Sequence, residues 1–197
     1  MIEVEKKFSL TEEQLARLTK DALFLHQQKF TDIYFDNSTF DIGKRNFWFR
    51  KRGDNFELKV PTGVQAVAMN VFREVTDLRE IAALLSMKQH SDDFEENVYS
   101  NGFEKLAEIV TTRRKYKLGD YTIDADEADF GHRVCEIERM VDREDQIEEA
   151  QVKIFELARS FGLEIKPTHG KLLEYIVRYN PTYYETLEKL GIIGTRV

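Results

Sequence analysis

The sequence is poor in several features that would point directly to a function. Its 197 residues include one cysteine, Cys135, so an internal disulfide is excluded. Its four histidines are scattered and lack the spacing of a zinc site. No run of about 18 apolar residues exists, which argues against a transmembrane helix. Charged residues crowd the first few positions, so these cannot be the apolar core of a signal peptide. The simplest expected location is cytoplasmic, with no membrane partner.

Positive charge is also scarce relative to negative charge. The 29 lysines and arginines are outnumbered by 36 aspartates and glutamates, which gives a net charge of −7. A nonspecific nucleic-acid binder would more often be basic overall, so no nucleic-acid partner is expected. The chain is long enough for one sizeable domain, and it contains no internal repeat or low-complexity linker. We therefore expect one domain over residues 1–197, helices from about 144 included, that is a monomer.

Residue periodicity predicts an α+β domain with about eight strands. The expected strands are 2–9, 27–35, 46–52, 55–60, 66–75, 104–117, 120–126 and 133–141. Helices are expected at 11–22, from 77 onward, at 91–101, at 144–161, around 172–177 and from 181 to about 191. Thr11 and Gln14 form a capping box, which supports the first helix start.

The strands carry charge on one face and apolar residues on the other. Side chains alternate along a strand, so Glu3, Glu5 and Lys7 share a face. The same reading gives these charged-face residues: Glu3, Glu5, Lys7, Arg50, Arg52, Lys59, Glu74, Arg113, Lys117, Asp124, Asp126, Glu136 and Glu138. One such face would ordinarily be solvated, but six strands repeat the pattern. Because the apolar faces need burial, we expect helices to cover the outside of a barrel whose interior is charged.

Other residues of the same strands lie on the face opposite to the charged one. Arg73 and Arg114 point away from the charged face, so they are expected at the surface. Cys135 also lies opposite the glutamates of its strand, which makes it a packing residue.

The composition of the charged faces indicates a specific chemistry. Carboxylates at this density repel one another unless a cation neutralises them. Oxygen ligands without histidine or cysteine favour a hard ion, Mg²⁺ or alternatively Mn²⁺. Arginine and lysine suit phosphate groups, which arginine binds bidentately. Together they predict a site for a metal-bound polyphosphate. A binding module for a polyphosphate or nucleotide is the non-enzyme alternative, but it would need few metal ligands.

The stretch Glu3-Val-Glu5-Lys-Lys7 resembles the E-x-E-x-K signature of the CYTH superfamily, the triphosphate tunnel metalloenzymes. The order of the later charged elements is similar as well, to about Arg178. Within the superfamily the chain is most similar to the thiamine triphosphatase family. The matching stretches are Ile2–Phe8, Asp32–Asp36, Trp48–Arg52, Ala128–Gly131 and Gly170–Leu172.

The resemblance implies an eight-stranded antiparallel tunnel with flanking helices, one or two Mg²⁺ ions and a small-molecule triphosphate substrate. Lys7 and Tyr34 resemble a catalytic dyad, and Lys59 or a metal-bound carboxylate would take the proton of the attacking water. The implied phosphate-binding residues are Arg50, Arg52, Lys59, Arg113 and Lys171. Trp48 would contact the thiamine rings, for which cation–π attraction to the thiazolium gives a physical basis. The implied metal ligands are Glu3, Glu5, Glu74, Asp124, Glu136 and Glu138.

Two other activities on the same fold stay open. An inorganic tripolyphosphatase is the first, and an adenylate cyclase is the second, against which the Lys7–Tyr34 pair argues. Lys115 adds a basic residue to the family pattern, and residues 61–71 are not closely similar to it. Both departures concern the choice of substrate more than the type of reaction.

Overall fold

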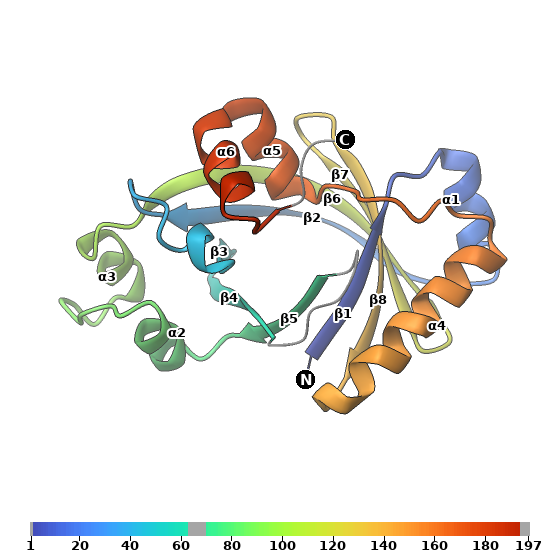
Figure 1. Cartoon of the computed structure of the whole chain (residues 1–197), viewed down its shortest axis with the longest axis horizontal. Helices are drawn as coiled ribbons and strands as arrows, with labels where there is room; N and C mark the ends of the chain where they lie inside the picture. The colour runs from blue at the N-terminus through green and yellow to red at the C-terminus, as the bar shows by residue number, and fades with distance from the viewer. Residues whose placement is uncertain (1, 63–69, 194–197) are drawn as a thin grey trace.

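The computed structural model describes residues 2–62 and 70–193, and its strands close into a barrel (Figure 1). Neighbouring strands follow the order β1-β5-β4-β3-β2-β6-β7-β8, and every pair is antiparallel. The strands are β1 (Ile2–Phe8), β2 (Leu23–Asp36), β3 (Trp48–Arg52), β4 (Asn55–Pro61), β5 (Asn70–Val75), β6 (Glu104–Leu118), β7 (Tyr121–Ala128) and β8 (Arg133–Val141). The predicted eight-stranded antiparallel barrel is confirmed. Of the strand expected at 66–75, residues 66–69 lie outside the described residues.

The helices of the described residues lie at three places around the barrel (Figure 1). They are α1 (Glu12–Thr19), α2 (Leu78–Leu84), α3 (Phe94–Ser100), α4 (Ile147–Ser160), α5 (Lys171–Tyr179) and α6 (Pro181–Lys189). Short 3-10 turns are η1 (Gly43–Arg45) and η2 (Glu144–Gln146). The capping box of Thr11 and Gln14 is present at the start of α1.

Two apolar clusters cover the outer face of the barrel, as the alternation predicts. One packs α1 and α4 against Val4, Ile123 and Ile137. The other includes Ile81 of α2 and Val98 of α3, together with outward residues of β2 to β5. Cys135 belongs to the first cluster, where burial raises the pKa of its thiol. Its expected role as a packing residue is therefore confirmed.

The third cluster, unlike the other two, lies on the inner face of the sheet. Helices α5 and α6 pack against Ala107 and Ile109 of β6 and Ala128 of β7. Ala107 and Ile109 share the strand parity of Arg113, so they lie on the inner face of the sheet. The C-terminal helices therefore cover the concave side of the β2–β6 ribbon at one end of the barrel.

The ribbon of β2 and β6 extends beyond the closed part of the barrel. Strand β2 begins at Leu23 rather than at residue 27, because it pairs with β6 as far as Lys117. Residues 23–29 of β2 are exposed there. Lys117 is exposed too and donates to the Asp120 carbonyl at 3.3 Å. Its expected place inside the barrel is therefore wrong.

Candidate active site

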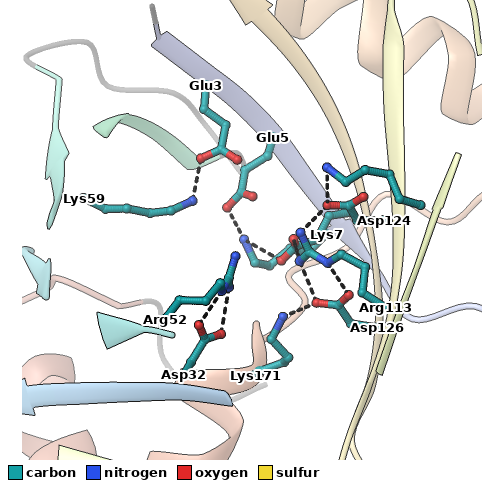
Figure 2. Close-up of polar contacts among 12 residues, drawn as sticks. Glu3, Glu5, Lys7, Asp32, Arg52, Lys59, Arg113, Asp124, Asp126 and Lys171 are labelled. Atoms are coloured by element: carbon teal, nitrogen blue, oxygen red, sulfur yellow. Dashed lines mark hydrogen bonds and ion pairs between the residues drawn. The ribbon is translucent and has the colours of Figure 1, made fainter. Parts of the chain in front are cut away.

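A cavity of about 920 Å³ fills the interior of the barrel and falls in the size range of small-molecule sites. The predicted site residues that line it are Glu3, Glu5, Lys7, Tyr34, Trp48, Arg50, Arg52, Lys59, Glu74, Arg113, Glu136, Glu138 and Lys171. Asp124 is fully buried beside the cavity, with its carboxylate paired to Arg113 and Lys115. Strand alternation therefore brings side chains from strands far apart in the sequence to one space (Figure 2).

Lysines face carboxylates on the β1 side of the cavity. Lys59 donates to Glu3 at 2.5 Å, and Lys7 pairs with Glu5 (Figure 2). Lys7 also lies 3.5 Å from Glu136. Burial lowers the pKa of Lys59, but the carboxylates of Glu5 and Glu3 outweigh it, so that pKa lies well above its ordinary value. Burial also lowers the pKa of Lys7, but the carboxylates of Glu5 and Glu136 outweigh it, so that this pKa too is raised. Both lysines therefore remain charged at neutral pH.

Arg113 is the centre of a buried ion network on the opposite wall. Its guanidinium donates to both oxygens of Asp126, at 2.6 and 2.7 Å, and to Glu136 at 3.2 Å. Lys171, at the start of α5, donates to the same Asp126 carboxylate (Figure 2). The network holds Arg113 and Lys171 in place with their charged groups facing the cavity.

The sequence reading gave no role to two carboxylates that orient the other arginines. Asp32 is fully buried and accepts two hydrogen bonds from Arg52, at 2.7 and 2.8 Å. Glu57 accepts from Arg50 at 2.8 Å. Burial opposes ionisation of Asp32, yet the bonds from Arg52 lower its pKa below the ordinary value. The alternation of side chains along a strand could have identified both carboxylates. Asp32 lies two residues before Tyr34, and Glu57 lies two residues before Lys59, so each shares a strand face with a predicted site residue.

Lys7 and Tyr34, the expected dyad, face the same cavity but have different partners. Lys7 contacts Glu5 and Glu136, whereas the Tyr34 phenol lies near Arg50 and Asp32. Burial and the Asp32 charge raise the pKa of Tyr34, so the phenol keeps its proton. Tyr34 can therefore donate a hydrogen bond to an anionic ligand held by Arg50.

One end of the cavity is apolar. Trp48, at the start of β3, and Ile192 and Ile193, which follow α6, all pack against the apolar cluster that α5 and α6 form with β6. These three residues line the cavity, and we call the end that they form the mouth. An indole at the rim of a charged cavity can contact an organic group attached to a polyphosphate.

The carboxylates fit a hard divalent cation. Within 4.8 Å of one another lie carboxylate oxygens of Glu3, Glu5 and Glu138, and in a second group those of Asp124, Glu136 and Glu138. Burial and the surrounding carboxylates raise the pKa of Glu138 well above its ordinary value. In the described part of the chain, Asp124 Oδ1 is buried without a hydrogen-bond partner. An oxygen-only donor set of this kind suits Mg²⁺. Glu74 is in neither group and lies 3.3 Å from Lys59.

Comparison with known proteins assigns the family. The model of the CYTH domain matches residues 1–167. The chain belongs to the CYTH family. Members of this family are enzymes that act on triphosphates, and this chain is accordingly an enzyme. Helices α5 and α6 follow the matched region. No helix among residues 2–62 and 70–193 is long and apolar enough to cross a membrane.

Individual relatives agree with this assignment. Human thiamine-triphosphatase is 30% identical to the chain over 207 residues, covering 95% of the chain and 89% of the human protein. The enzyme from Macaca fascicularis gives the same identity and coverage. Among solved structures, the PH1819 protein of Pyrococcus horikoshii has a TM-score of 0.66 and 24% identity, with 89% and 98% of the two chains covered.

A second solved structure has the same fold at lower sequence identity. It is the putative adenylyl cyclase of Hippeastrum, described as having a dominant triphosphatase activity. Its TM-score is 0.54 at 14% identity, covering 90% of this chain and 94% of that protein. At such identities these two structures establish the fold alone.

Proposed function

We propose that this enzyme hydrolyses thiamine triphosphate to thiamine diphosphate and phosphate with Mg²⁺ as cofactor. The observation that carries the proposal is a single cavity in which oriented arginines and lysines face carboxylate groups, with Trp48 at an apolar mouth. The similarity to thiamine-triphosphatase supports the same substrate. Inorganic tripolyphosphate is the alternative substrate, because the charged interior alone would accept it. An adenylate cyclase on this fold is a less favoured alternative.

The cations of the cavity would bind and orient the phosphate chain. Arg52 and Arg113 are each held bidentately by a carboxylate, so their guanidinium forks are fixed before substrate arrives. Arg50 and Lys171 would add donors from neighbouring walls. Positioning and electrostatic stabilisation supply most of the catalysis of phosphoryl transfer, so preoriented donors are what this reaction needs.

Glu3, Glu5 and Glu138 would hold the Mg²⁺, with Asp124 and Glu136 on the adjoining side. When bound, a divalent cation neutralises charge on phosphoryl oxygens and so favours attack by water. Glu74 lies 3.3 Å from Lys59 and would act through that lysine or through water.

The proton of the attacking water would go to a carboxylate rather than to Lys59. Lys59 has a raised pKa, so its ammonium is already protonated and binds phosphoryl oxygens instead. Lys7 would lie beside the scissile bond and stabilise charge on the bridging oxygen. Tyr34, neutral and next to Arg50, would donate a hydrogen bond to the phosphate chain.

A substrate panel tests the proposal. Phosphate release would be measured from thiamine triphosphate, tripolyphosphate and ATP, each with Mg²⁺ or with EDTA. We expect the highest kcat/KM with thiamine triphosphate and Mg²⁺. A higher value for tripolyphosphate would favour the alternative, and cyclic nucleotide formation from ATP would favour the cyclase.

Replacing Trp48 with alanine distinguishes a thiamine triphosphatase from an inorganic tripolyphosphatase. A cation–π contact with the thiazolium is worth roughly 1–2 kcal/mol when partly desolvated, so kcat/KM for thiamine triphosphate should fall about five- to thirtyfold. Tripolyphosphate has no ring, and its hydrolysis should barely change. Equal losses for both substrates would mean that Trp48 only supports the cavity wall.

A further inference from the structure

Phe30 of β2 lies where three cations of the cavity converge. Its ring centroid is 4.1 Å from the Arg52 guanidinium carbon, 5.6 Å from that of Arg113 and 5.8 Å from Lys171 Nζ. These three cations line the cavity, whereas Phe30 is not among the described residues that do so. The ring therefore backs the three cations on the side away from the cavity.

Carboxylates hold the same cations from the side. Asp32 binds Arg52, and Asp126 binds both Arg113 and Lys171 (Figure 2). Each cation is thus fixed between a buried carboxylate and the aromatic face, to which partly desolvated cations are attracted. None of them can swing aside without breaking a charge-assisted hydrogen bond. We call Phe30 with these three cations the floor of the cavity.

The floor lies opposite the apolar mouth. Strand β3 runs from Trp48 at the mouth to Arg52 at the floor, a separation of four residues. That corresponds to roughly 13 Å along a strand. On the proposed function, the thiamine group lies at Trp48 and the triphosphate extends inward. The terminal phosphoryl group would then meet the floor.

We infer that Phe30, by holding these three cations in place, sets the inner limit of the cavity. It thereby fixes how deep a triphosphate enters and which phosphoanhydride bond is cut. This inference rests on the proposed function for the direction of the substrate. At the fixed depth, water oxygen bonds to the terminal phosphorus while the bond from that phosphorus to the bridging oxygen breaks. The bridging oxygen leaves with the electron pair on the diphosphate, and the water proton passes to a carboxylate.

A deeper position would change the products. A chain moved inward by one phosphate would present the next phosphorus to the same groups. Attack by water there breaks the inner phosphoanhydride bond and releases pyrophosphate with thiamine monophosphate. The ratio of pyrophosphate to phosphate therefore reports the depth of binding, and general damage to the fold does not change that ratio.

The test replaces Phe30 with alanine and measures products by ³¹P NMR. We expect the pyrophosphate share to rise severalfold, while kcat for terminal cleavage falls about ten- to a hundredfold because the reacting phosphorus is misplaced. Phe30→Leu, which keeps most of the apolar volume, should retain terminal cleavage. Phe24→Ala is the matched control, since Phe24 lies on the same strand, is 52% exposed and contacts Tyr116. It should give wild-type rates and products.

Tetrapolyphosphate provides a test on the wild-type enzyme that needs no variant and no organic group. A closed floor predicts phosphate plus tripolyphosphate, whereas two pyrophosphates would overturn the inference. A Phe30→Ala enzyme with the wild-type product ratio and rate would overturn it as well. If tetrapolyphosphate is cut terminally but thiamine triphosphate is not hydrolysed, the proposed substrate is wrong and the floor stands.

Discussion

Glu136 and Glu138 are two residues apart on one face of β8, yet the groups around Glu136 are mainly positively charged and those around Glu138 are negatively charged. Burial disfavours ionisation of Glu136, but Lys7, Lys171 and Arg113 outweigh it and lower its pKa. Glu138 is buried among Glu3, Asp124 and other carboxylates, which raises its pKa. The charge of Glu136 therefore stabilises the metal-free fold, and the charge of Glu138 destabilises it.

Amide substitutions at these positions should move stability in opposite directions. In EDTA at neutral pH, Glu138→Gln should hold or raise Tm, because it removes a repelled carboxylate. Glu136→Gln should cost about 1.5–3 kcal/mol, the worth of a charged hydrogen bond, and so lower Tm by roughly 3–12 °C. Thermal unfolding followed by circular dichroism measures both. Equal shifts of the same sign would contradict the assigned environments.

At the residue scale, parity along the strands predicted which side chains face the interior but not their neighbours. It placed Glu136 and Glu138 together, whereas their charge environments depend on strands β1, β6 and β7. It also placed Lys117 inside the barrel, which is wrong. Alternation tells which face of the sheet a side chain lies on, but not whether that part of the strand lies within the closed barrel. Asp32 lay within a recognised stretch, but only the pairing of β2 with β3 brings it against Arg52.

At the scale of elements, a buried tyrosine joins α6 to the end of β2 and to η1. Tyr183 Oη donates to Asp36 at 2.6 Å, and Asp36 also accepts from the Gly43 backbone at 2.9 Å. A Cβ at Gly43 would overlap the Tyr183 hydroxyl and lie 2.7 Å from its ring carbon Cζ. The glycine is therefore required by this close approach of η1 to α6.

Gly43→Ala should loosen this attachment. Overpacking of a buried contact costs about 1–3 kcal/mol, which corresponds to a Tm loss of roughly 2–12 °C. KM for thiamine triphosphate should rise while KM for tripolyphosphate stays near wild type, because the segment after α6 supplies Ile192 and Ile193 to the mouth. Tyr183→Phe in the same chain should recover part of the Tm loss. Simple additivity of the two changes would exclude a clash between them.

The strands were easier to predict than the ends and placement of the other elements. Alternation with a period of two identified each strand, but the start of β2 depended on how far β6 extends, a tertiary property. The amphipathic patterns of α4 and α5 look alike in the sequence. The structure places α4 on the outer face and α5 on the inner face, because β6 presents Ala107 and Ile109 inward where the charged cavity ends.

At the scale of the whole molecule, a bound cation should stabilise the barrel. A ligand at about one hundred times its Kd stabilises by about 2.7 kcal/mol, so saturating Mg²⁺ should raise Tm by roughly 5–11 °C. Ca²⁺ should support turnover poorly, since it favours looser coordination. Glu5→Gln should lose most of the shift. Full turnover after exhaustive chelation, or a Tm unaffected by Mg²⁺, would contradict the metal role.

The closure of the barrel joins the beginning of the chain to strands made much later. Strand β1 lies beside β8 (Figure 1). The two strands pair across the closing seam, where Glu5 lies opposite Glu138. Contacts this distant in sequence slow folding, because a long loop must close before they form. During synthesis the edge of β1 that pairs with β8 must wait for residues near 141. The charged side chains of β1 disfavour pairing of that exposed edge with other chains. Glu3, Glu5 and Glu138 come together only once this seam has closed. Metal binding by these three residues would therefore report that the barrel has finished folding.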